Sequence, residues 1–527
     1  MTKEVDSERY GLQWVGRAEA LRAAIDPPSG ALIPDRACSL EWEEANHVIV
    51  EGDNLEVLRI LQRSYFGAVQ LIFIDPPYNT GGSFLYRDNY RDPIGEYLRF
   101  SEQVDEEQRR LTTNTDLSGR FHSRWLTMMY PRLALARSLL AESGFLVVTI
   151  DDHEVHNLRI LLDELFGPEN FVANVVWQKT YTANMTARLI SNTHDHVLIY
   201  AKMAEKASFG RIPRTPAQLA AFKNWDDDPK GPWKAENLSA GRYYAAGQFT
   251  ISTPAGRTVA PPQGRYWRCN ELQYDTWLAQ GRIWFGKKGG GRPMLKRYLC
   301  ESKEGLTPGT WWPHDECGSN KEASLELKKL FDGEMVFDTP KPVRLLRRIL
   351  HLCAPSGSLI LDFFAGSGTT AHAVLDANEE DEGQRRFLLV QLPVPTGRGL
   401  ISELCIERVR RAGRGKVDAG FRVFRLGRGP SDDDEAMLVE MLLWGGFPLD
   451  TRLVRHDLAA GALFEADFQG RSALLALDKI DDATGRWMLR RDADLVLLRD
   501  NVFKGNDALK VNLSHQLAAA GVAMRVL

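Results

Sequence analysis

Short apolar segments that stop abruptly at glycine, proline or acidic residues alternate along this chain with longer segments of helical periodicity. The short apolar segments predict buried strands over residues 48–50, 71–74, 144–152, 172–178, 196–200, 358–362 and 387–391. The periodic segments predict helices over residues 14–25, 55–64, 124–140, 154–166 and 343–352. Strands and helices that alternate in this way are typical of an α/β protein with a mostly parallel sheet.

The strand at residues 71–74 ends in the tetrapeptide Asp75-Pro76-Pro77-Tyr78. Neither proline can donate a backbone N–H, so carbonyl oxygens remain beside a carboxylate and an aromatic ring. The carboxyl ends of strands in an open α/β sheet are where ligands bind. A strand-terminating turn with an exposed acid is the simpler alternative for this tetrapeptide taken alone.

The chemistry that fits the tetrapeptide is methyl transfer to an exocyclic amino group of a nucleobase. Asp75 and the carbonyl of Pro76 would accept the two N–H hydrogens and so free the nitrogen lone pair. Tyr78 would stack on the base, a contact worth ~1–3 kcal/mol. The base must first leave the duplex, which costs a few kcal/mol.

A second strand with a polar ending lies far downstream, at residues 358–362, and continues into a glycine-rich turn and a helix. Gly366 and Gly368 let the backbone approach a ligand closely, and the N-terminus of the following helix favours a bound carboxylate. The turn lacks the third glycine of a dinucleotide-binding motif and the Gly-Lys-Ser/Thr of a P-loop. Taken alone, the turn leaves its ligand open.

Together, the D-P-P-Y tetrapeptide and the F-x-G-x-G turn (Phe364, Gly366, Gly368) resemble the signature motifs of the S-adenosylmethionine-dependent amino-methyltransferases of DNA. The tetrapeptide comes first, which matches the β-class of that family. The resemblance implies a doubly wound, Rossmann-like sheet with permuted motif order, in which the glycine-turn strand lies beside the strands that end at Asp53 and Asp75. It also implies S-adenosylmethionine as cofactor and adenine N6 in double-stranded DNA as target, with cytosine N4 as the open chemical alternative.

The same resemblance assigns roles to individual residues. Asp53 would bind the adenine amino group of the cofactor, although a helix N-cap explains the same residue. Thr339 and Lys341, in an F-x-T-x-K-P element, would hold the methionine carboxylate. Gln391 stands where many methyltransferases place an acid for the ribose hydroxyls. The expected cofactor-binding residues are Asp53, Thr339, Lys341, Pro342, Asp362, Phe363, Phe364, Gly366, Gly368, Thr369 and Gln391, and the expected catalytic residues are Asp75, Pro76, Pro77 and Tyr78.

Residues 203–335 separate the two motifs and differ in composition. Between residues 257 and 299 there are nine Lys or Arg residues against two acids, aromatic residues are interleaved, and residues 286–292 form a flexible basic loop suited to phosphates. A solvated basic face is the alternative, but the basic and aromatic excess favours DNA contact. The β-class carries its target recognition domain at this position. The expected DNA-binding residues are Arg265, Arg268, Arg282, Lys287, Lys288 and Arg292.

The overall composition limits the location of the protein and its chemistry. The formal net charge is −4 over 527 residues, so a nucleic-acid surface must be a local basic patch. No apolar run approaches membrane length and the first residues lack signal-peptide character, so we expect a cytoplasmic protein without a membrane partner. Six scattered cysteines fit reduced thiols. No metal site is expected, since His194-Asp195-His196 fits the polar edge of a strand.

We predict five regions along the chain. They are an N-terminal extension (1–48), the first half of the methyltransferase core (49–202), the target recognition domain (203–335), the second half of the core (336–417) and a small C-terminal module (418–527). Residues 83–122, a long polar segment beside the tetrapeptide, are predicted to form a lid over the flipped base.

Further segments resemble the modification subunits of type III restriction systems, among them residues 264–268 and 497–512. That resemblance implies a homodimer and an ATP-driven restriction subunit as partner, with an orphan methyltransferase as an alternative. A DNA specificity subunit without activity is disfavoured because both motifs are intact. A nicotinamide enzyme is disfavoured because no G-x-G-x-x-G turn with a downstream ribose acid is present.

Overall fold

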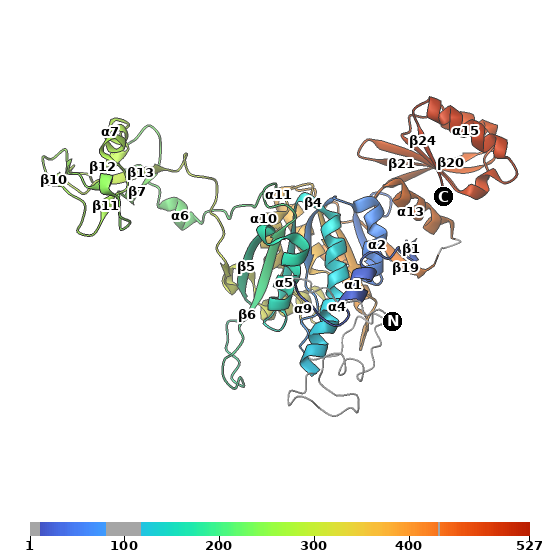
Figure 1. Cartoon of the computed structure of the whole chain (residues 1–527), viewed down its shortest axis with the longest axis horizontal. Coiled ribbons are helices and arrows are strands. Elements are labelled where there is room, and N and C mark those ends of the chain that lie inside the picture. The colour runs from blue at the N-terminus through green and yellow to red at the C-terminus, as the bar shows by residue number, and fades with distance from the viewer. Residues whose placement is uncertain (1–10, 81–116, 430–432) are drawn as a thin grey trace, which may run out of the picture. The chain divides into compact units, whose positions relative to one another are not determined.

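The computed structural model describes residues 11–80, 117–429 and 433–527. The chain divides into two compact units, one comprising Met1–Phe209 with Gly309–Leu527 and the other Gly210–Pro308 (Figure 1). The smaller unit falls inside the range predicted for the target recognition domain, whereas residues 309–335 belong to the larger unit.

The larger unit is built on a ten-stranded sheet. From β19 to β4 the neighbouring strands pair in parallel, β1 pairs antiparallel with β19, and β6 pairs antiparallel with both β4 and β5. The edge strand β14 pairs in parallel with β5. The strand order is β1 (Gly30–Pro34), β19 (Phe421–Arg428), β2 (His47–Glu51), β16 (Arg386–Gln391), β15 (Leu359–Asp362), β3 (Val69–Ile74), β4 (Leu140–Ile150), β6 (His194–Ala201), β5 (Phe171–Gln178) and β14 (Trp311–Trp312).

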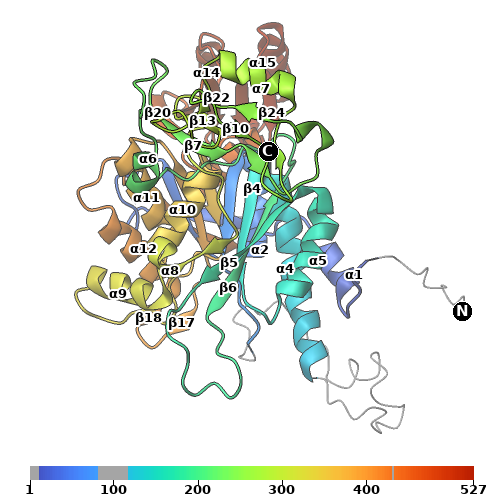
Figure 2. The same cartoon turned by 90° about the vertical axis from the view of Figure 1, so that its left-hand side faces the viewer.

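Helices cover both faces of this sheet, as Figure 2 shows. One layer holds α1 (Arg17–Ala23), α2 (Asn54–Tyr65), α4 (Leu117–Leu139) and α5 (Val155–Phe166), and the other holds α10 (Val343–Cys353), α11 (Thr369–Asp381) and α12 (Ile401–Ala412). Two short helices, α8 (His314–Cys317) and α9 (Asn320–Leu330), precede α10. The expected doubly wound α/β architecture is therefore confirmed.

The two motif strands are neighbours in the centre of the sheet. β15 pairs in parallel with β3, with Ile360 opposite Leu71 and Leu361 opposite Ile72. All four of these side chains are at most 1% exposed, because helices cover both faces and a central strand must then be apolar on both sides. Parallel pairing makes both strands end at the same edge of the sheet.

One expected adjacency is wrong. β15 does not lie beside β2, because β16 lies between them and pairs with both. The reason is the β15–α11–β16 connection, a compact parallel crossover that places its second strand next to its first. The strand that leads to Asp53 is therefore two places from the glycine turn. The antiparallel pair expected at residues 172–178 and 196–200 is present as β5 and β6.

The C-terminal region contributes to two sheets. β19 belongs to the central sheet, although the predicted module began at residue 418. Beyond it, α13 (Asp434–Gly445) leads to a five-stranded sheet, β20 (Arg452–Leu458), β21 (Gly461–Phe468), β22 (Arg471–Ala476), β23 (Leu495–Leu498) and β24 (Ala523–Val526), with α14 (Asp482–Met488) and α15 (Asp507–Ala519). The sequence did not separate β19 from this sheet because both consist of short apolar strands.

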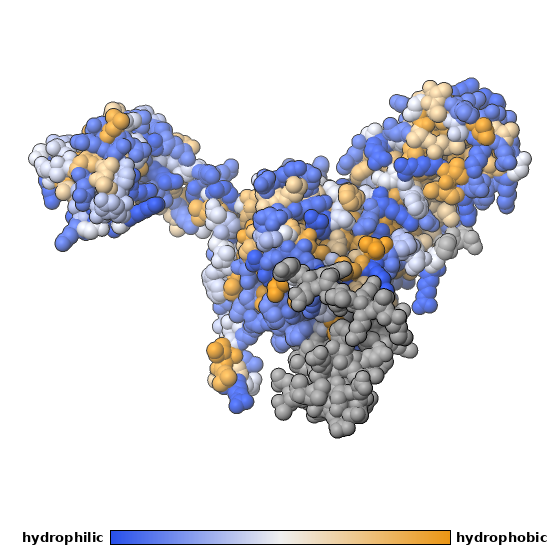
Figure 3. Space-filling model, viewed as in Figure 1, coloured by the Kyte–Doolittle hydropathy of each residue, from blue (hydrophilic) through white to orange (hydrophobic). Residues whose placement is uncertain are grey.

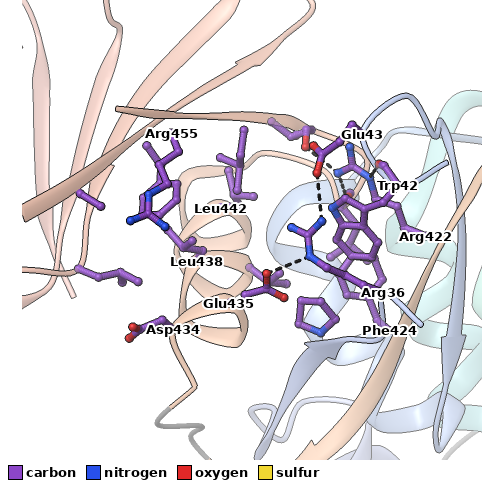
Figure 4. A pocket seen from close by; sticks show the side chains of 18 of the residues that line it. Arg36, Trp42, Glu43, Arg422, Phe424, Asp434, Glu435, Leu438, Leu442 and Arg455 are labelled. Atoms are coloured by element: carbon purple, nitrogen blue, oxygen red, sulfur yellow. Dashed lines mark hydrogen bonds and ion pairs between the residues drawn. The ribbon is translucent and has the colours of Figure 1, made fainter. Parts of the chain in front are cut away.

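A hollow of about 380 Å³ lies between α13, β20 to β22 and the N-terminal segment around Trp42 (Figure 4). Arg36 donates to Glu43 and Glu435, and its guanidinium lies 4.7 Å from the centre of the Trp42 ring. The Arg422 guanidinium, on the same ring at 5.2 Å, donates to backbone carbonyls. These charges are satisfied within the protein, so we interpret the hollow as the joint between the five-stranded sheet and the core.

The smaller unit has a mixed architecture of short strands. Its largest sheet has the order β12 (Ile283–Trp284), β13 (Met294–Tyr298) and β7 (Trp233–Asn237). Two-stranded pairs add β8 (Ser239–Ala240) with β11 (Tyr266–Trp267) and β9 (Ile251–Ser252) with β10 (Thr258–Val259), and the helices are α6 (Pro216–Ala220) and α7 (Glu271–Ala279).

The helices and the cysteines bear on the expected absence of a membrane span and on the expected reduced thiols. Among the residues described, no helix combines the length and the apolar character that crossing a bilayer requires. All six cysteines are free thiols, and four of them are buried.

Candidate active site

Asp75 follows β3 directly, and both of its carboxylate oxygens are held. The Thr149 hydroxyl, near the end of the adjacent strand β4, donates to Oδ1 at 2.6 Å. The Lys341 ammonium lies 2.6 Å from Oδ2. The Thr149 side chain is fully buried, whereas that of Asp75 is 26% exposed. The buried Thr149 hydroxyl therefore orients the Asp75 carboxylate, and the Lys341 ammonium, 266 residues downstream, neutralises its charge.

Tyr78 lies in the same polar cluster. Its hydroxyl donates to Asp195 Oδ2 at 3.4 Å, and Asp195 Oδ1 pairs with Lys179 at 2.7 Å. Burial, together with the charges of Asp75 and Asp195, raises the pKa of Tyr78 well above its usual value. Burial also raises the pKa of Asp195, against the opposing effect of Lys341 and Lys179. The phenol therefore stays neutral and acts as a hydrogen-bond donor.

The two prolines of the tetrapeptide differ in their surroundings. The Pro77 carbonyl accepts a hydrogen bond of 2.7 Å from the indole of Trp125, which is fully buried on α4. The Pro76 carbonyl has no hydrogen-bond partner within the part of the chain that the structure describes. The tetrapeptide is thus fixed at Pro77, and an acceptor remains at Pro76 beside Asp75.

The glycine turn needs its glycines for two reasons. Gly366 and Gly368 have φ values of +55° and +83°, which side-chain-bearing residues rarely adopt. A Cβ on Gly368 would lie 3.0 Å from the Cys405 sulfur on α12. The Gly366 N–H donates to Gln391 Oε1 at 2.6 Å, and Gln391 Nε2 donates to the Leu392 carbonyl. Gln391, expected at the ribose position, therefore braces the turn.

Asp362 stabilises the same turn from within. Its carboxylate accepts the Phe364 N–H at 3.0 Å and the Thr370 hydroxyl. Burial raises the pKa of Asp362 to about 7, although both hydrogen bonds lower it. On the other side, one nitrogen of the buried Arg408 donates at 2.7 Å to the hydroxyls of Ser367 and Thr369.

A third segment connects the tetrapeptide to the glycine turn. The Phe337 ring lies 3.7 Å from the position that a Cβ on Gly366 would occupy. Four residues later, Lys341 reaches Asp75, and its ammonium lies 5.0 Å from the centre of the Tyr78 ring. The charge of Asp75 also contributes to the raised pKa of Asp362. The two motifs and the F-x-T-x-K-P element therefore open onto one site.

The remaining expected cofactor residues occupy different surroundings. Asp53 is the N-cap of α2, accepting from the N–H groups of Leu55 and Glu56 at 2.9 and 3.3 Å. Thr339 is exposed, and Pro342 is buried as the N-cap residue of α10. Phe363 is fully buried in the core, and its carbonyl accepts from Asn54 at 2.7 Å. Asp53 therefore acts as a helix N-cap, and its role in cofactor binding stays a prediction.

Sequence reasoning missed Thr149, Asp195 and Lys179 as members of this site. Asp195 was interpreted as part of a polar strand edge. Side chains alternate along β6, so the neighbouring His194 and His196 point to the opposite face, where His196 Nε2 lies 3.1 Å from Asp152 Oδ1. Period-two alternation was therefore the available signal that Asp195 points elsewhere. The segment expected to be a lid, residues 83–122, lies almost entirely outside the described residues.

The six expected DNA-binding residues fall into two groups. Arg265 donates to Ser239, Arg268 to the Asn237 carbonyl, and Arg282 pairs with Glu301, so these three stabilise the smaller unit. Lys287, Lys288 and Arg292 are exposed on the glycine-rich loop at residues 286–292.

Burial contradicts the aromatic part of the DNA-contact argument for three residues, whereas Tyr266, Trp277 and Trp284 are partly exposed. Trp267, Tyr274 and Phe285 are at most 5% exposed and form the core of the smaller unit. A small unit with little regular structure has few other large side chains to bury, so its aromatic residues serve packing.

Comparison with known proteins places this site in a family. The family model described as DNA methylase matches residues 69–389. The Mod subunit of the type III restriction-modification enzyme StyLTI from Salmonella typhimurium is 36% identical over 417 residues, which are 76% of this chain and 62% of the relative. The Mod subunit of EcoP15I from Escherichia coli is 30% identical over 80% of this chain and 72% of the relative.

A type II methyltransferase, M.KpnI from Klebsiella pneumoniae, is 30% identical over 68% of this chain and 85% of the relative. The match to the Salmonella Mod subunit covers 62% of that relative, so this chain spans less than two thirds of its length. The family model nevertheless covers more than half of the chain and includes both motifs and the segment that joins them. This chain belongs to the DNA methylase family.

Proposed function

We propose that this protein transfers a methyl group from S-adenosylmethionine to N6 of an adenine that is flipped out of double-stranded DNA. The observation that carries the proposal is the segment at residues 337–342, which contacts the glycine turn at Phe337 and Asp75 at Lys341. A cofactor at the turn and an amine at Asp75 would then meet in one site.

The residues at the glycine turn fit the proposed cofactor. At the left-handed Gly366 a Cβ would meet no atom closer than the Phe337 ring at 3.7 Å, and Thr339 and Lys341 offer donors for the methionine carboxylate. When bound, S-adenosylmethionine supplies the electrophilic methyl group on its sulfonium. The chain's own residues bind and orient the cofactor and the target amine, whose N–H groups Asp75 and the Pro76 carbonyl would accept, so catalysis rests on positioning and electrostatics.

Asp75 would accept one N–H of the target amine and the Pro76 carbonyl the other. Thr149 stays on Oδ1 and fixes the plane of the carboxylate. Lys341 must leave Oδ2, because its ammonium occupies the oxygen and the ring face of Tyr78 that the base requires. The carboxylate of the cofactor offers Lys341 an alternative partner, so cofactor binding would prepare Asp75 for the base.

The relatives suggest a biological setting. Two of them are named as Mod subunits of type III restriction-modification enzymes. We infer that this chain is the modification component of a similar system in the cytoplasm, that it forms a homodimer and that it pairs with an ATP-dependent restriction subunit. The exposed basic side chains of Lys287, Lys288 and Arg292 would contact DNA phosphates within the target recognition domain.

Mapping modified bases tests this proposal. Genomic DNA from a host expressing the chain is sequenced for N6-methyladenine and N4-methylcytosine, with the empty host as reference. We expect N6-methyladenine at one new sequence motif. N4-methylcytosine at a motif would correct the target base, and the absence of any new modified base would contradict the function.

A further inference from the structure

The loop between β5 and β6 carries an apolar tip that is exposed among the described residues of the larger unit. Met185, Leu189 and Ile190 are 96%, 89% and 90% exposed. Figure 3 shows apolar surface, in orange, on the loop that projects from this part of the larger unit. Of the described large apolar side chains, only Val417 is as exposed, and it stands alone. Three such side chains gathered on one turn indicate an interaction surface.

The tip is held in shape by its own hydrogen bonds. The Asn184 N–H donates to the Ser191 hydroxyl at 2.7 Å, which closes the turn at its neck. Asn184 Oδ1 accepts from the N–H and the hydroxyl of Thr186 at 3.0 and 2.7 Å. An apolar group that is pre-shaped in this way loses less conformational freedom when it enters a partner.

The base of this loop is the wall of the candidate active site. Lys179, the first residue after β5, pairs with Asp195, the second residue of β6, across 2.7 Å. Asp195 in turn accepts the hydroxyl of Tyr78, the residue proposed to stack on the target base. Met185 is six residues from Lys179, so the tip can extend at most ~20 Å from the site. A duplex with one base in the site would extend through this distance range, so the tip is long enough to reach it.

The charge of the loop fits the same partner. Residues 179–193 contain Lys179 and Arg188 and no acid, in a chain of net charge −4. Proteins that kink or open DNA insert apolar wedges, including methionine, leucine and isoleucine, between bases. A flipped base leaves a gap in the stack that such a wedge can fill.

Building on the proposed function, we propose that the β5–β6 loop inserts Met185, Leu189 and Ile190 into the DNA base stack and holds open the space vacated by the target adenine. The loop thereby couples extrusion of the base to its delivery at Asp75 and Tyr78, because both ends of the loop form the wall of that site.

The test uses the full chain and duplexes that carry the methylation motif mapped for the wild type. The loop variant is M185S/L189S/I190S, and the matched control is I25S/V417S, whose residues are 82% and 93% exposed outside the loop. A third variant, M185L/I190L, keeps the tip apolar. Base extrusion is read from 2-aminopurine fluorescence at the target position, and kcat/KM is measured on an intact duplex and on one with an abasic site opposite the target.

We expect the serine variant to lose about tenfold or more in fluorescence response and in kcat/KM on the intact duplex. Its activity on the abasic duplex should stay within about threefold of the wild type, because extrusion there is easier. Cofactor binding and thermal unfolding should be unchanged, and both the control and the leucine variant should behave like the wild type.

Wild-type behaviour of the serine variant on the intact duplex would overturn the inference. So would an equal loss on both duplexes, which indicates general DNA binding, or dissociation of a dimer in light scattering, which indicates a subunit contact. A wild-type chain that methylates neither duplex would overturn the proposed function and this inference with it.

Discussion

The two loops that end β3 and β15 lie at the same edge of the sheet but are held in opposite ways. The glycine turn is satisfied locally, since Asp362 binds the Phe364 N–H within its own turn and Gln391 binds the Gly366 N–H from the next strand. The Asp75 carboxylate is held by Thr149 and Lys341, which are 74 and 266 residues away.

The glycine turn is therefore already shaped to bind a ligand, whereas the Asp75 carboxylate must exchange a partner before it can bind one. The polar groups of the glycine turn are already paired, so a ligand can dock there without breaking them. Asp75 is paired with Thr149 through Oδ1 and with Lys341 through Oδ2, so Oδ2 can change partners while Oδ1 stays fixed. Cofactor binding would therefore use the rigid glycine turn, and methyl transfer would use the more adaptable Asp75 loop. Substitutions in each loop should have different effects.

The largest effect is expected at Asp75. Asp75→Asn removes the charge and leaves a nearly isosteric side chain, so methyl transfer should fall on the order of 10³-fold or more, by analogy with the loss of a single transition-state contact. A labelled-methyl transfer assay on DNA measures this. Thr80→Ser, an exposed neighbour, is the control, and turnover of Asp75→Asn within tenfold of the wild type would remove Asp75 from the catalytic role.

Gly368→Ala should disturb the rigid loop. The alanine would combine an unfavourable φ of +83° with a Cβ 3.0 Å from the Cys405 sulfur, and should cost roughly 2–4 kcal/mol of the free energy of unfolding. Gly415→Ala is the matched control, because its φ is +77° but nothing lies within 4 Å. Chemical unfolding measures both, and equal losses would show that close packing at the turn is unimportant.

Thr149→Val tests the fixed half of the Asp75 pairing. Loss of one hydrogen bond to a carboxylate costs roughly 1.5–3 kcal/mol, so kcat should fall by about 10- to 100-fold. Thr149→Ser retains the hydroxyl and should recover most of the activity. Comparable losses in both variants would assign Thr149 to packing.

The raised pKa of Asp362 predicts a pH dependence of cofactor binding. Burial raises the pKa of Asp362 to about 7, so most of this carboxyl is protonated at pH 6. A cationic cofactor favours the ionised form, and its affinity should therefore rise up to about tenfold per pH unit between pH 5 and 7 and level off above. Asp362→Asn should flatten this profile in calorimetry, and an unchanged slope would exclude Asp362 as its source.

The same pKa has a consequence for folding. Because the pKa in the folded chain lies above the ordinary value of 3.8, ionisation of Asp362 opposes folding. Its contribution to the free energy of unfolding is fully present below about pH 4 and is lost as the pH rises through 7. The sign is thus opposite to that of a salt-bridged carboxylate.

Periodicity and two short motifs were sufficient to predict the doubly wound sheet and the meeting of the tetrapeptide with the glycine turn at one edge. The contact between Asp75 and Lys341 was not predicted, because the sequence assigned Lys341 to the cofactor carboxylate. They could not place Thr149 or Asp195, because those residues reach the site through the pairing of β3, β4 and β6, which no local pattern encodes. The position of β16 beside β15 followed from a crossover rather than from a motif. In the smaller unit the sequence suggested DNA contact for basic and aromatic residues alike. Only the burial of their side chains in the structure distinguishes core residues from surface residues.

The central claim is that two motifs distant along the chain form one site that shares Lys341. Calorimetric titration of S-adenosylmethionine into the wild type, Asp75→Asn and Lys341→Met in the absence of DNA tests it most directly. We predict that Asp75→Asn binds the cofactor several-fold more tightly, because Lys341 no longer has to leave Asp75, and that Lys341→Met binds it at least about tenfold more weakly. Unchanged affinity in both variants would contradict the claim.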